Sequence, residues 1–371
     1  MAGGVVEKPL TILVRMPNWL GDCVMAMPAL RHICETLPQA KIYLSGRRQF
    51  GGLFMSQPGV SGFVEAPGSG LGNLVKGLAG AKRRVRGAGV PMPVDFGLLF
   101  TNSLSTALWM WRSGAQRRVG YSLDSRRLFL TDPVPCGGVE KSRHFINYYL
   151  WLAQTLESAL SEGGETPCRQ VAPLADYHYP SICVSDAGRN EAARIAHSLG
   201  CAGRYAVIAP ASAYGPVKDW PVENYRALVK TLNHEFGLSV LVTGAAAQKD
   251  VCQAIADDQK AAYNTAGLTS LDGFLGMLAD ARAFIGGDSG GAHVAAALSI
   301  PTIVIFGITN PSRTRPTGRR VASLGEGAEK DIKLNTPRAR AAAKHALASI
   351  RPEQVAKKLA ALFAADSVGK E

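Results

Sequence analysis

Apolar runs and polar turns alternate regularly in the first part of the chain. Leu10–Arg15 is a compact apolar run, residues 16–22 form a polar turn, and an apolar stripe predicts a helix over Cys23–Leu37. The run Lys41–Leu44 then predicts a second strand. A strand, a turn, a helix and a further strand in this order form a βαβ unit, which predicts a parallel sheet.

The alternation continues to about residue 160 and then stops. Val94–Phe100 predicts a strand, Ser103–Arg112 a helix, and His144–Leu160 a long amphipathic helix. Residues 67–93 are rich in Gly, Lys and Arg, which favours a basic loop with at most one weak helix. Residues 161–180 are rich in Gly, Pro and polar side chains, and this composition is typical of a linker.

A second series of strands and helices begins after the linker. The segments that define it are Asp186–Leu199, Tyr205–Ala209, Val222–Phe236, Ser239–Thr243, Gln248–Asp257, Leu271–Ala279, Ala283–Leu298, Thr302–Phe306 and Pro352–Phe363. We therefore predict an α/β protein with two doubly wound, Rossmann-like domains, at residues 1–175 and 181–350. A C-terminal helix within residues 351–371 is expected to pack back across the domains. Ligands of such sheets bind at the carboxyl ends of the strands, and here we also expect them in a cleft between the halves.

One stretch, residues 283–298, combines a short apolar strand, a glycine-rich turn and the start of a helix. Glycines allow close approach, and the N–H groups of a helix's first turn attract anions, so the turn could bind a phosphate or a nucleotide. Ser289 also lies in a Gly-x-Ser-x-Gly pattern, which is typical of a serine hydrolase, and Asp331 and His345 follow in the required order. In a third interpretation, Asp288 or Ser289 only caps the helix and the glycines serve packing.

The composition narrows the class of partner. The 371 residues carry a formal net charge of +12, which favours an acidic partner such as a phosphorylated ligand or an anionic membrane surface. The basic residues are not interleaved with aromatic side chains, so we expect no nucleic acid partner. The 7 cysteines show neither a CxxC pair nor a metal-ligand spacing, which indicates reduced thiols. With no visible signal peptide and no apolar run of roughly 18–20 residues, a cytoplasmic protein is expected.

Three polar side chains at strand–helix turns are candidates for chemistry. Asp22 follows the first strand, where it could act as a general base toward a hydroxyl or serve as an N-cap. Lys218 could stabilise a leaving diphosphate or be a solvated surface lysine. His293 could contact a phosphate or be a buried structural histidine. No GxGxxG motif follows a strand and no GxxxxGK[ST] motif occurs, which argues against a dinucleotide site and a P-loop.

Five short motifs resemble, in their order along the chain, those of one known family. They are Pro17-x-Trp19-x-Gly21-Asp22, Arg118-x-Gly120-Tyr121 with Arg126 or Arg127, Gly215-Pro216-x-Lys218-x-Trp220-Pro221, Gly244-Ala245, and Asp288-Ser289-Gly290-x-x-His293 with its continuation to Leu298. Together they resemble the bacterial ADP-heptose:lipopolysaccharide heptosyltransferases (glycosyltransferase family 9), and within them the heptosyltransferase II branch. The resemblance covers residues 10–365, nearly the whole chain.

The resemblance implies an inverting glycosyltransferase of the GT-B fold that requires no metal and no cofactor, because the ADP-sugar is a substrate. It assigns Asp22 as the base that deprotonates the acceptor hydroxyl, and Lys218 as a catalytic residue that stabilises the leaving diphosphate. The residues implied for binding of the donor, ADP-L-glycero-D-manno-heptose, are Ser212, Lys218, Gly244, Asp288, Ser289, Gly290, Gly291 and His293. Those implied for the acceptor are Trp19, Gly21, Arg118, Tyr121, Arg126 and Arg127.

The implied acceptor is the lipid-linked, phosphorylated inner-core oligosaccharide of lipopolysaccharide. We therefore expect a cytoplasmic monomer, peripheral at the inner face of the inner membrane, where the basic knot Lys82, Arg83 and Arg84 meets phosphates and anionic lipid.

Two departures from the family pattern keep other functions open. Residues 246–248 (Ala, Ala, Gln) stand where the family often has an acidic or polar cluster near the nucleotide ribose, and Gly291 replaces a larger apolar residue. The alternatives are a same-fold transferase for another nucleotide sugar, a serine hydrolase that uses Ser289, and a non-catalytic nucleotide binder.

Overall fold

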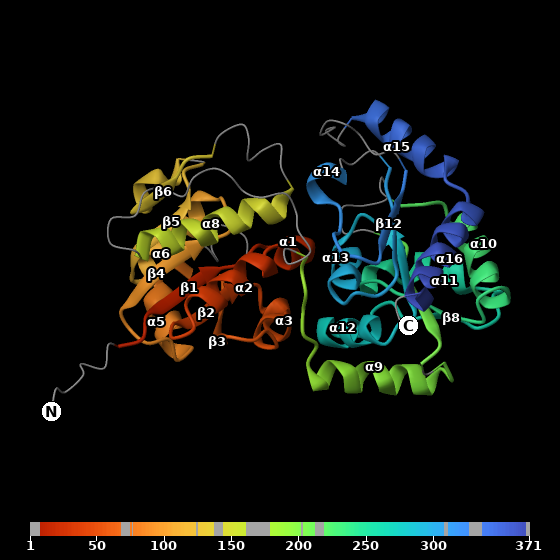
Figure 1. The fold of residues 1–371 in the computed structure, drawn as a ribbon, viewed down its shortest axis with the longest axis horizontal. Helices are drawn as coiled ribbons and strands as arrows, with labels where there is room; N and C mark the ends of the chain where they lie inside the picture. Colours follow the sequence, from red (N-terminus) through yellow and green to blue (C-terminus); the bar gives the residue numbers. More distant parts are fainter. Residues whose placement is uncertain are drawn as a thin grey trace. The chain divides into compact units, whose positions relative to one another are not determined.

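The computed structural model divides into two α/β units, Met1–His178 and Tyr179–Glu371 (Figure 1). It describes residues 8–67, 75, 77–123, 125–136, 144–160, 179–201, 203–211, 219–307, 311–325 and 336–368. In these residues each unit has a parallel sheet of six strands. The predicted α/β class with two doubly wound halves is therefore confirmed.

The sheet of the first unit has the strand order β3-β2-β1-β4-β5-β6. Its strands are β1 (Thr11–Arg15), β2 (Lys41–Gly46), β3 (Val60–Glu65), β4 (Val94–Leu99), β5 (Ala115–Tyr121) and β6 (Asp132–Val134). All five residues of β1 are buried, as expected for a central parallel strand with both faces covered.

Helices cover both faces of this sheet. They are α1 (Leu20–Met25), α2 (Met27–Thr36), α3 (Gly51–Met55), α5 (Ala81–Gly87), α6 (Leu104–Ser113) and α8 (Phe145–Leu160), with short 3-10 turns η1 (Arg48–Phe50) and η2 (Arg126–Phe129). Helix α2 packs on α8, and α5 packs on α6. Leu13 of β1 joins the core formed with Val85 of α5 and Trp109 of α6.

The helix expected over Cys23–Leu37 is two helices. It breaks at Ala26, and Pro28 lies in the first turn of the second helix, α2. A proline is favoured there because its missing N–H would have had no partner within the helix.

The sheet of the second unit has the order β12-β11-β10-β7-β8-β9. Its strands are β7 (Tyr205–Ala209), β8 (Ser239–Val242), β9 (Ala262–Asn264), β10 (Ala283–Gly287), β11 (Thr302–Ile305) and β12 (Val321–Leu324). Its helices are α9 (Asp186–Ser198), α10 (Val222–His234), α11 (Lys249–Ala256), α12 (Leu271–Ala279), α13 (Gly290–Ala297), α14 (Pro311–Thr314), α15 (Pro337–Ser349) and α16 (Pro352–Val368), with the 3-10 turn η5 (Ala246–Gln248).

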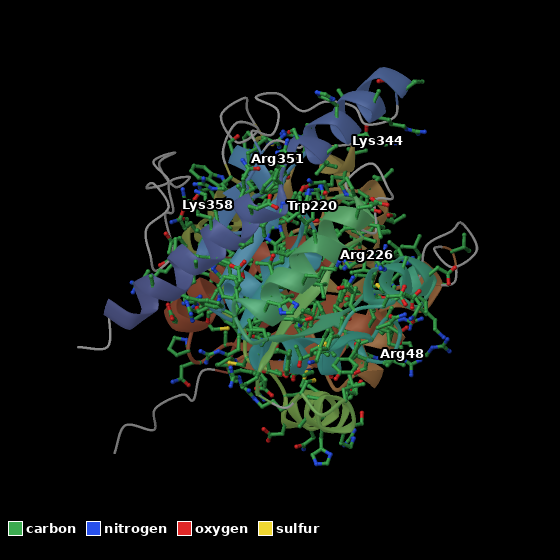
Figure 2. All side chains as sticks on the ribbon, turned by 90° about the vertical axis from the view of Figure 1, so that its right-hand side faces the viewer. Arg48, Trp220, Arg226, Lys344, Arg351 and Lys358 are labelled. Carbon is green, nitrogen blue, oxygen red and sulfur yellow. The ribbon has the colours of Figure 1, made fainter. Side chains whose placement is uncertain are left out.

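One face of this sheet is covered by α10, α11 and the C-terminal helices. Val355 and Leu359 of α16 are buried in the same core as Leu228 of α10, while Lys358 is exposed (Figure 2). Trp220, also labelled in Figure 2, is buried and its indole Nε1 donates to the carbonyl of Ile350 over 3.0 Å. This hydrogen bond ties the start of α10 to the junction of α15 and α16.

Helices α9 and α12 approach each other closely through glycines. A Cβ atom on Gly276 would lie 2.2 Å from the carbonyl oxygen of Gly188, and one on Gly188 would lie 2.3 Å from that of Asp272. Only residues without a side chain allow this backbone contact. None of the described helices combines the length and the apolar character that a membrane crossing needs.

Candidate active site

The two turns singled out in the sequence follow strands at the centre of their sheets. In the first unit the strand order reverses between β1 and β4, and Asp22 follows β1. In the second unit it reverses between β10 and β7, and the glycine-rich turn follows β10. Ligands of doubly wound sheets bind at the carboxyl ends of strands where the order reverses. Each turn therefore occupies the favoured binding edge of its own sheet.

Asp22 lies in the first turn of α1, and its carboxylate is held by Tyr149 from α8. The Tyr149 hydroxyl donates to Asp22 Oδ1 over 3.3 Å. Burial, and then the charge of Asp22, raise the pKa of that hydroxyl well above its usual value, so it stays protonated and keeps donating. The Tyr149 ring also packs edge-on against Phe100, with centroids 5.3 Å apart. Packing and hydrogen bonding thus orient a half-buried carboxylate at the end of β1.

The beginning of α1 tests one of the two interpretations of Asp22, the N-cap. The helix starts at Leu20, and its N-cap is Trp19 rather than Asp22. The N-cap interpretation of Asp22 is therefore wrong. Trp19 is 58% exposed, and the guanidinium of Arg47 lies over its ring, 5.6 Å from the centroid. Gly21 is half-buried within the same helix turn.

Among the expected acceptor residues, Tyr121 and Arg126 are wholly buried. The Tyr121 hydroxyl donates to the carbonyl of Tyr148 over 2.8 Å. Arg126 donates to the carbonyls of Tyr121 and Thr101 and to the side chain of Asn102. These contacts bind the η2 turn to the ends of β4 and β5.

The other two arginines expected to bind the acceptor, Arg118 and Arg127, differ in exposure. Arg118 donates to the carbonyls of Phe129, Ala115 and Gln116, and burial lowers the pKa of its guanidinium. Arg127 is exposed.

The turn after β10 has the predicted strand–turn–helix form. Ser289 is the N-cap of α13, with extended backbone angles and no side-chain capping bond. Asp288, Gly290 and Gly291 are half-buried, and His293 is 5% exposed. The N–H groups of a helix's first turn have no partner within the helix, so this end of α13 is suited to an anion.

The glycine at position 291 is one of the departures from the family pattern, and its surroundings in the structure account for it. A Cβ atom there would lie 3.2 Å from Cζ of Phe274 and 3.4 Å from Cζ of Phe284. Two aromatic rings thus occupy the space that a larger apolar residue would fill.

The remaining donor candidates fall in two loops. Gly244 follows β8, and its carbonyl accepts a hydrogen bond from the N–H of Gly267 over 2.9 Å. The Gln248 side chain accepts from the N–H of Ala245 over 2.9 Å. Ser212 and Lys218 lie outside the described residues.

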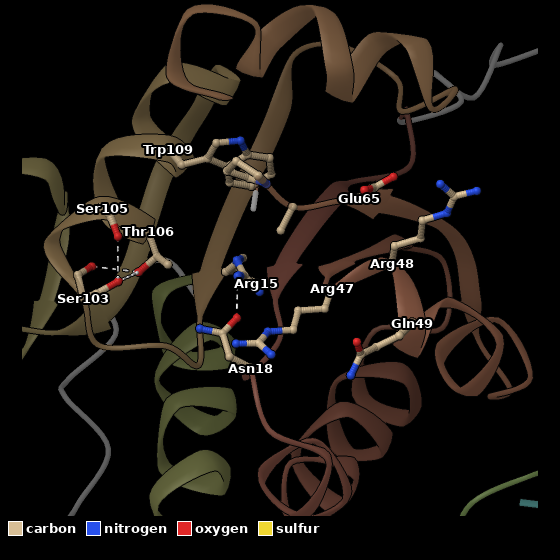
Figure 3. Close-up of a pocket in the computed structure, with 12 residues that line it drawn as sticks. Arg15, Asn18, Arg47, Arg48, Gln49, Glu65, Ser103, Ser105, Thr106 and Trp109 are labelled. Atoms are coloured by element: carbon tan, nitrogen blue, oxygen red, sulfur yellow. Dashed lines mark hydrogen bonds between the residues drawn. The ribbon is translucent and has the colours of Figure 1, made fainter. Parts of the chain in front are cut away.

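A cavity of about 450 Å³ opens at the carboxyl ends of the strands in the first unit (Figure 3). It is lined by Arg15, Asn18, Arg47, Arg48, Gln49, Glu65, Ala66, Pro67, Ser103, Ser105, Thr106 and Trp109. Arg15 ends β1 and Arg47 follows β2, whereas the serine and threonine side chains come from the start of α6 after β4.

No motif in the sequence points to this arginine cluster. The available signal was Arg15, a charged residue that ends an otherwise apolar strand at the binding edge of a sheet. Arg47 lies at the corresponding end of the neighbouring strand β2. Among the described residues, no group of three or more His, Cys, Asp or Glu side chains could hold a metal ion.

The sequence profile of glycosyltransferase family 9 (heptosyltransferase) matches residues 92–341. The chain belongs to this family. It is 28% identical over 361 residues to lipopolysaccharide heptosyltransferase 2 of Escherichia coli strain K12, covering 95% of this chain and 99% of the relative. It is 25% identical over 367 residues to lipooligosaccharide heptosyltransferase 2 of Haemophilus ducreyi, covering 96% and 100%.

Solved structures agree in fold. ADP-heptose heptosyltransferase II of E. coli superposes with a TM-score of 0.76 at 23% identity, covering 96% of this chain and 100% of that one. An E. coli heptosyltransferase solved with ADP gives a TM-score of 0.64 at 18% identity, covering 95% and 100%. The expected GT-B fold and the resemblance to heptosyltransferase II are confirmed.

Family membership makes this chain a glycosyltransferase rather than a serine hydrolase. Of the two partners that a hydrolase would need for Ser289, His345 is exposed on α15, and Asp331 lies outside the described residues. The Gly-x-Ser-x-Gly string is therefore explained by the N-cap and first turn of α13.

Proposed function

We propose that this enzyme transfers heptose from ADP-L-glycero-D-manno-heptose to the inner core of lipopolysaccharide, with inversion at the anomeric carbon. Two named heptosyltransferase 2 relatives that match nearly the whole chain support this substrate class. The observation that carries the mechanism is the Asp22 carboxylate, which Tyr149 orients at the carboxyl end of β1.

In the proposed reaction, Asp22 accepts the proton of the acceptor hydroxyl. The hydroxyl oxygen then attacks the anomeric carbon from the face opposite the leaving group, and the bond from that carbon to the diphosphate oxygen breaks. Ser289 and the first-turn N–H groups of α13 stabilise the negative charge that develops on ADP. From the family resemblance, we assign Lys218 and Ser212 to the same diphosphate, and Gly244, Asp288 and His293 to the donor.

We further propose that the enzyme works without a metal, as a monomer at the cytoplasmic face of the inner membrane. Lys82, Arg83 and Arg84 are exposed on α5. Clustered basic side chains of this kind are attracted to anionic lipid by about 1 kcal/mol each.

A transferase for a different nucleotide sugar is the second candidate, and one observation favours it. Residues Ala246 and Ala247 are exposed, and Gln248 uses its side-chain oxygen to accept from Ala245. The segment after β8 therefore offers few polar groups to a ribose.

Nucleotide diphosphates distinguish the two candidates directly. We expect ADP to stabilise the purified protein by about 2.7 kcal/mol at a hundredfold excess over its Kd, because it binds only the folded state. UDP, GDP and CDP at the same concentration should stabilise it much less. Thermal unfolding or calorimetry measures this order, and a preference for UDP would reject the ADP-heptose proposal. Transfer of heptose from the ADP-sugar to a core acceptor, with a chelator present, completes the test.

The hydrogen bond from Tyr149 predicts a change in pH dependence. In Tyr149→Phe the Asp22 carboxylate loses the donor that orients it, so kcat should fall about tenfold. The same donor favours the charged form of the carboxylate, so its loss favours the protonated form. Because the base must be unprotonated, the acid limb of the kcat profile should move to higher pH.

Tyr205→Phe is the matched control, because it also removes a buried hydroxyl, one that donates to the carbonyl of Met277 in the second unit. It should leave the pH profile unchanged. Identical profiles for Tyr149→Phe and the wild type would show that Tyr149 does not act on the base.

A further inference from the structure

Helix α6 carries apolar side chains on its outer side as well as on its inner side. The inner side packs into the core of the first unit, to which it contributes Ala107 and Trp109. Leu104, Leu108 and Trp111 follow at spacings of four and three residues, so they share another face of the helix. Leu104 is 43% exposed and Trp111 47%, and Leu108 is half-buried. The outer face of a surface helix is normally polar, so this stripe indicates an interaction surface.

The apolar stripe continues onto the neighbouring turn η2. This turn packs against α6, and the ring centroids of Phe129 and Trp111 lie 5.8 Å apart. Leu128, next to Phe129, is 87% exposed. A single exposed leucine needs no explanation, but this one adjoins an aromatic pair and an apolar helix face. We call Leu104, Leu108, Trp111, Leu128 and Phe129 the α6–η2 patch.

Basic side chains border the α6–η2 patch. The guanidinium of Arg112 lies over the Trp111 ring, 5.8 Å from its centroid. Helix α5 packs beside α6 on the same core (Figure 1), and a Cβ atom on Gly114, the C-cap of α6, would lie 3.6 Å from Cε of Lys82. The sequences of α5, α6 and η2 contain no acidic residue. Their exposed basic residues are Lys82, Arg83, Arg84, Arg86, Arg112 and Arg127.

The charge around the patch distinguishes the occupants that an apolar surface could have. Among the described side chains, no carboxylate forms an ion pair with these six basic residues. Two copies of the chain joined through the patch would place the same positive charges opposite one another, which opposes a dimer. An anionic lipid surface instead supplies phosphates for the basic residues and hydrocarbon for the patch.

The residue types of the patch suit the boundary between lipid and water. Tryptophan is enriched there because its ring is apolar while its indole N–H is polar. Arginine can lay its aliphatic part along an apolar surface and keep its charge among the headgroups. Trp111 and Arg112 are stacked in a way that permits both at once.

We propose that the α6–η2 patch docks this protein on an anionic lipid bilayer. Trp111 and Leu128 enter the headgroup layer, and the six basic residues meet lipid phosphates. This inference rests on the proposed function for the place of the enzyme at a membrane. It deepens that function by naming the surface and by adding the insertion of apolar side chains to the attraction between charges.

Sedimentation of the full-length protein with lipid vesicles tests the surface without catalysis. Vesicles of phosphatidylglycerol and phosphatidylethanolamine should bind the wild type, and phosphatidylcholine vesicles should bind it at least about tenfold more weakly. The double variant Trp111→Gln/Leu128→Gln should lower the partition coefficient onto the anionic vesicles at least about tenfold, because two apolar side chains leave the interface. Arg112→Gln should lower it about fivefold. Leu268→Gln is the matched control, since it removes an exposed leucine from the second unit and should bind like the wild type.

Tryptophan fluorescence identifies the side chain that enters the lipid. Lipids brominated on their acyl chains should quench the fluorescence of the bound wild type. Trp111→Phe keeps an aromatic ring, so it should still bind the vesicles but lose this quenching. Quenching that persists in Trp111→Phe would place another tryptophan, such as the exposed Trp19, in the lipid and would overturn the proposal. The proposal is equally overturned if the wild type binds no anionic vesicles, or if the double variant binds them as tightly as the wild type.

Two acceptors separate this inference from the proposed function. The double variant should keep the wild-type unfolding midpoint and transfer heptose to a water-soluble core oligosaccharide at the wild-type rate, because its substitutions are at the surface. Its transfer to a lipid-linked acceptor in anionic vesicles should be at least about tenfold slower. If the wild type transfers heptose and vesicle binding does not depend on the patch, the inference fails and the proposed function stands. If neither acceptor receives heptose but vesicle binding still depends on Trp111 and Leu128, the proposed function fails and the docking surface is upheld.

Discussion

Replacing Asp22 with asparagine is expected to lower kcat for heptose transfer by about 10²–10⁴-fold, the usual contribution of a general base. The amide keeps the size of the carboxylate and an oxygen that can accept from Tyr149, but it cannot take the proton of the acceptor hydroxyl. Binding of ADP should be unchanged, because Asp22 belongs to the first unit and the proposed diphosphate site to the second. Steady-state transfer rates and calorimetry with ADP measure the two quantities.

Ser289→Ala provides the contrast to this variant. It removes a hydroxyl at the N-cap of α13 but no base, so the main effect should be weaker donor binding, with a KM for the ADP-sugar raised about tenfold. The proposed division of roles is falsified if Asp22→Asn transfers heptose at the wild-type rate with donor binding intact. Complete loss of turnover in Ser289→Ala at saturating donor would instead show that Ser289 takes part in the chemical step.

The positions of the two turns could be predicted because each follows a short, mainly apolar strand. Parallel strands with both faces covered read as continuous apolar runs, and β1 and β10 are buried at every position. The glycines of residues 286–291 then mark the change from strand to helix. Asp22 was located in the same way, from a polar turn directly after a buried run.

Short edge elements could not be predicted, because their sequences carry too little periodicity. Strands β9 and β12 have three and four residues with no fully buried position, so no alternating or continuous apolar pattern marks them. The basic segment that contains α15 also lacks a periodicity from which a helix could be predicted. Its helix is rich in Ala, and among its described side chains Ala343 and Leu347 are buried.

The roles of arginine side chains could not be predicted from the sequence, because the residue type does not tell whether a given arginine is buried or exposed. Arg15 and Arg126 are both buried at the carboxyl edge of the first sheet. Arg15 faces a cavity that can admit a ligand. The guanidinium of Arg126 instead donates to the backbone carbonyls of Tyr121 and Thr101 in the same unit. Sequence spacing alone cannot separate these two environments, because tertiary contacts between distant segments define both of them.

Arg126→Met is therefore expected to act on stability more than on acceptor binding. The thioether fills part of the volume, but the carbonyls of Thr101 and Tyr121 lose their charged donor inside the core. Leaving buried acceptors unpaired in this way should lower the free energy of unfolding by about 3 kcal/mol. Urea unfolding followed by tryptophan fluorescence reports on the affected unit, which contains Trp19, Trp109, Trp111 and Trp151.

Arg127→Met makes the same chemical change one residue further on, at an exposed position. Its free energy of unfolding should stay within about 0.5 kcal/mol of the wild type, as is usual for surface substitutions. If Arg126 instead binds the acceptor, as the family resemblance implies, the opposite result is expected for Arg126→Met. In that case Arg126→Met would keep wild-type stability and raise only the acceptor KM. The pair of variants thus decides whether this arginine serves the ligand or the fold that presents the cavity.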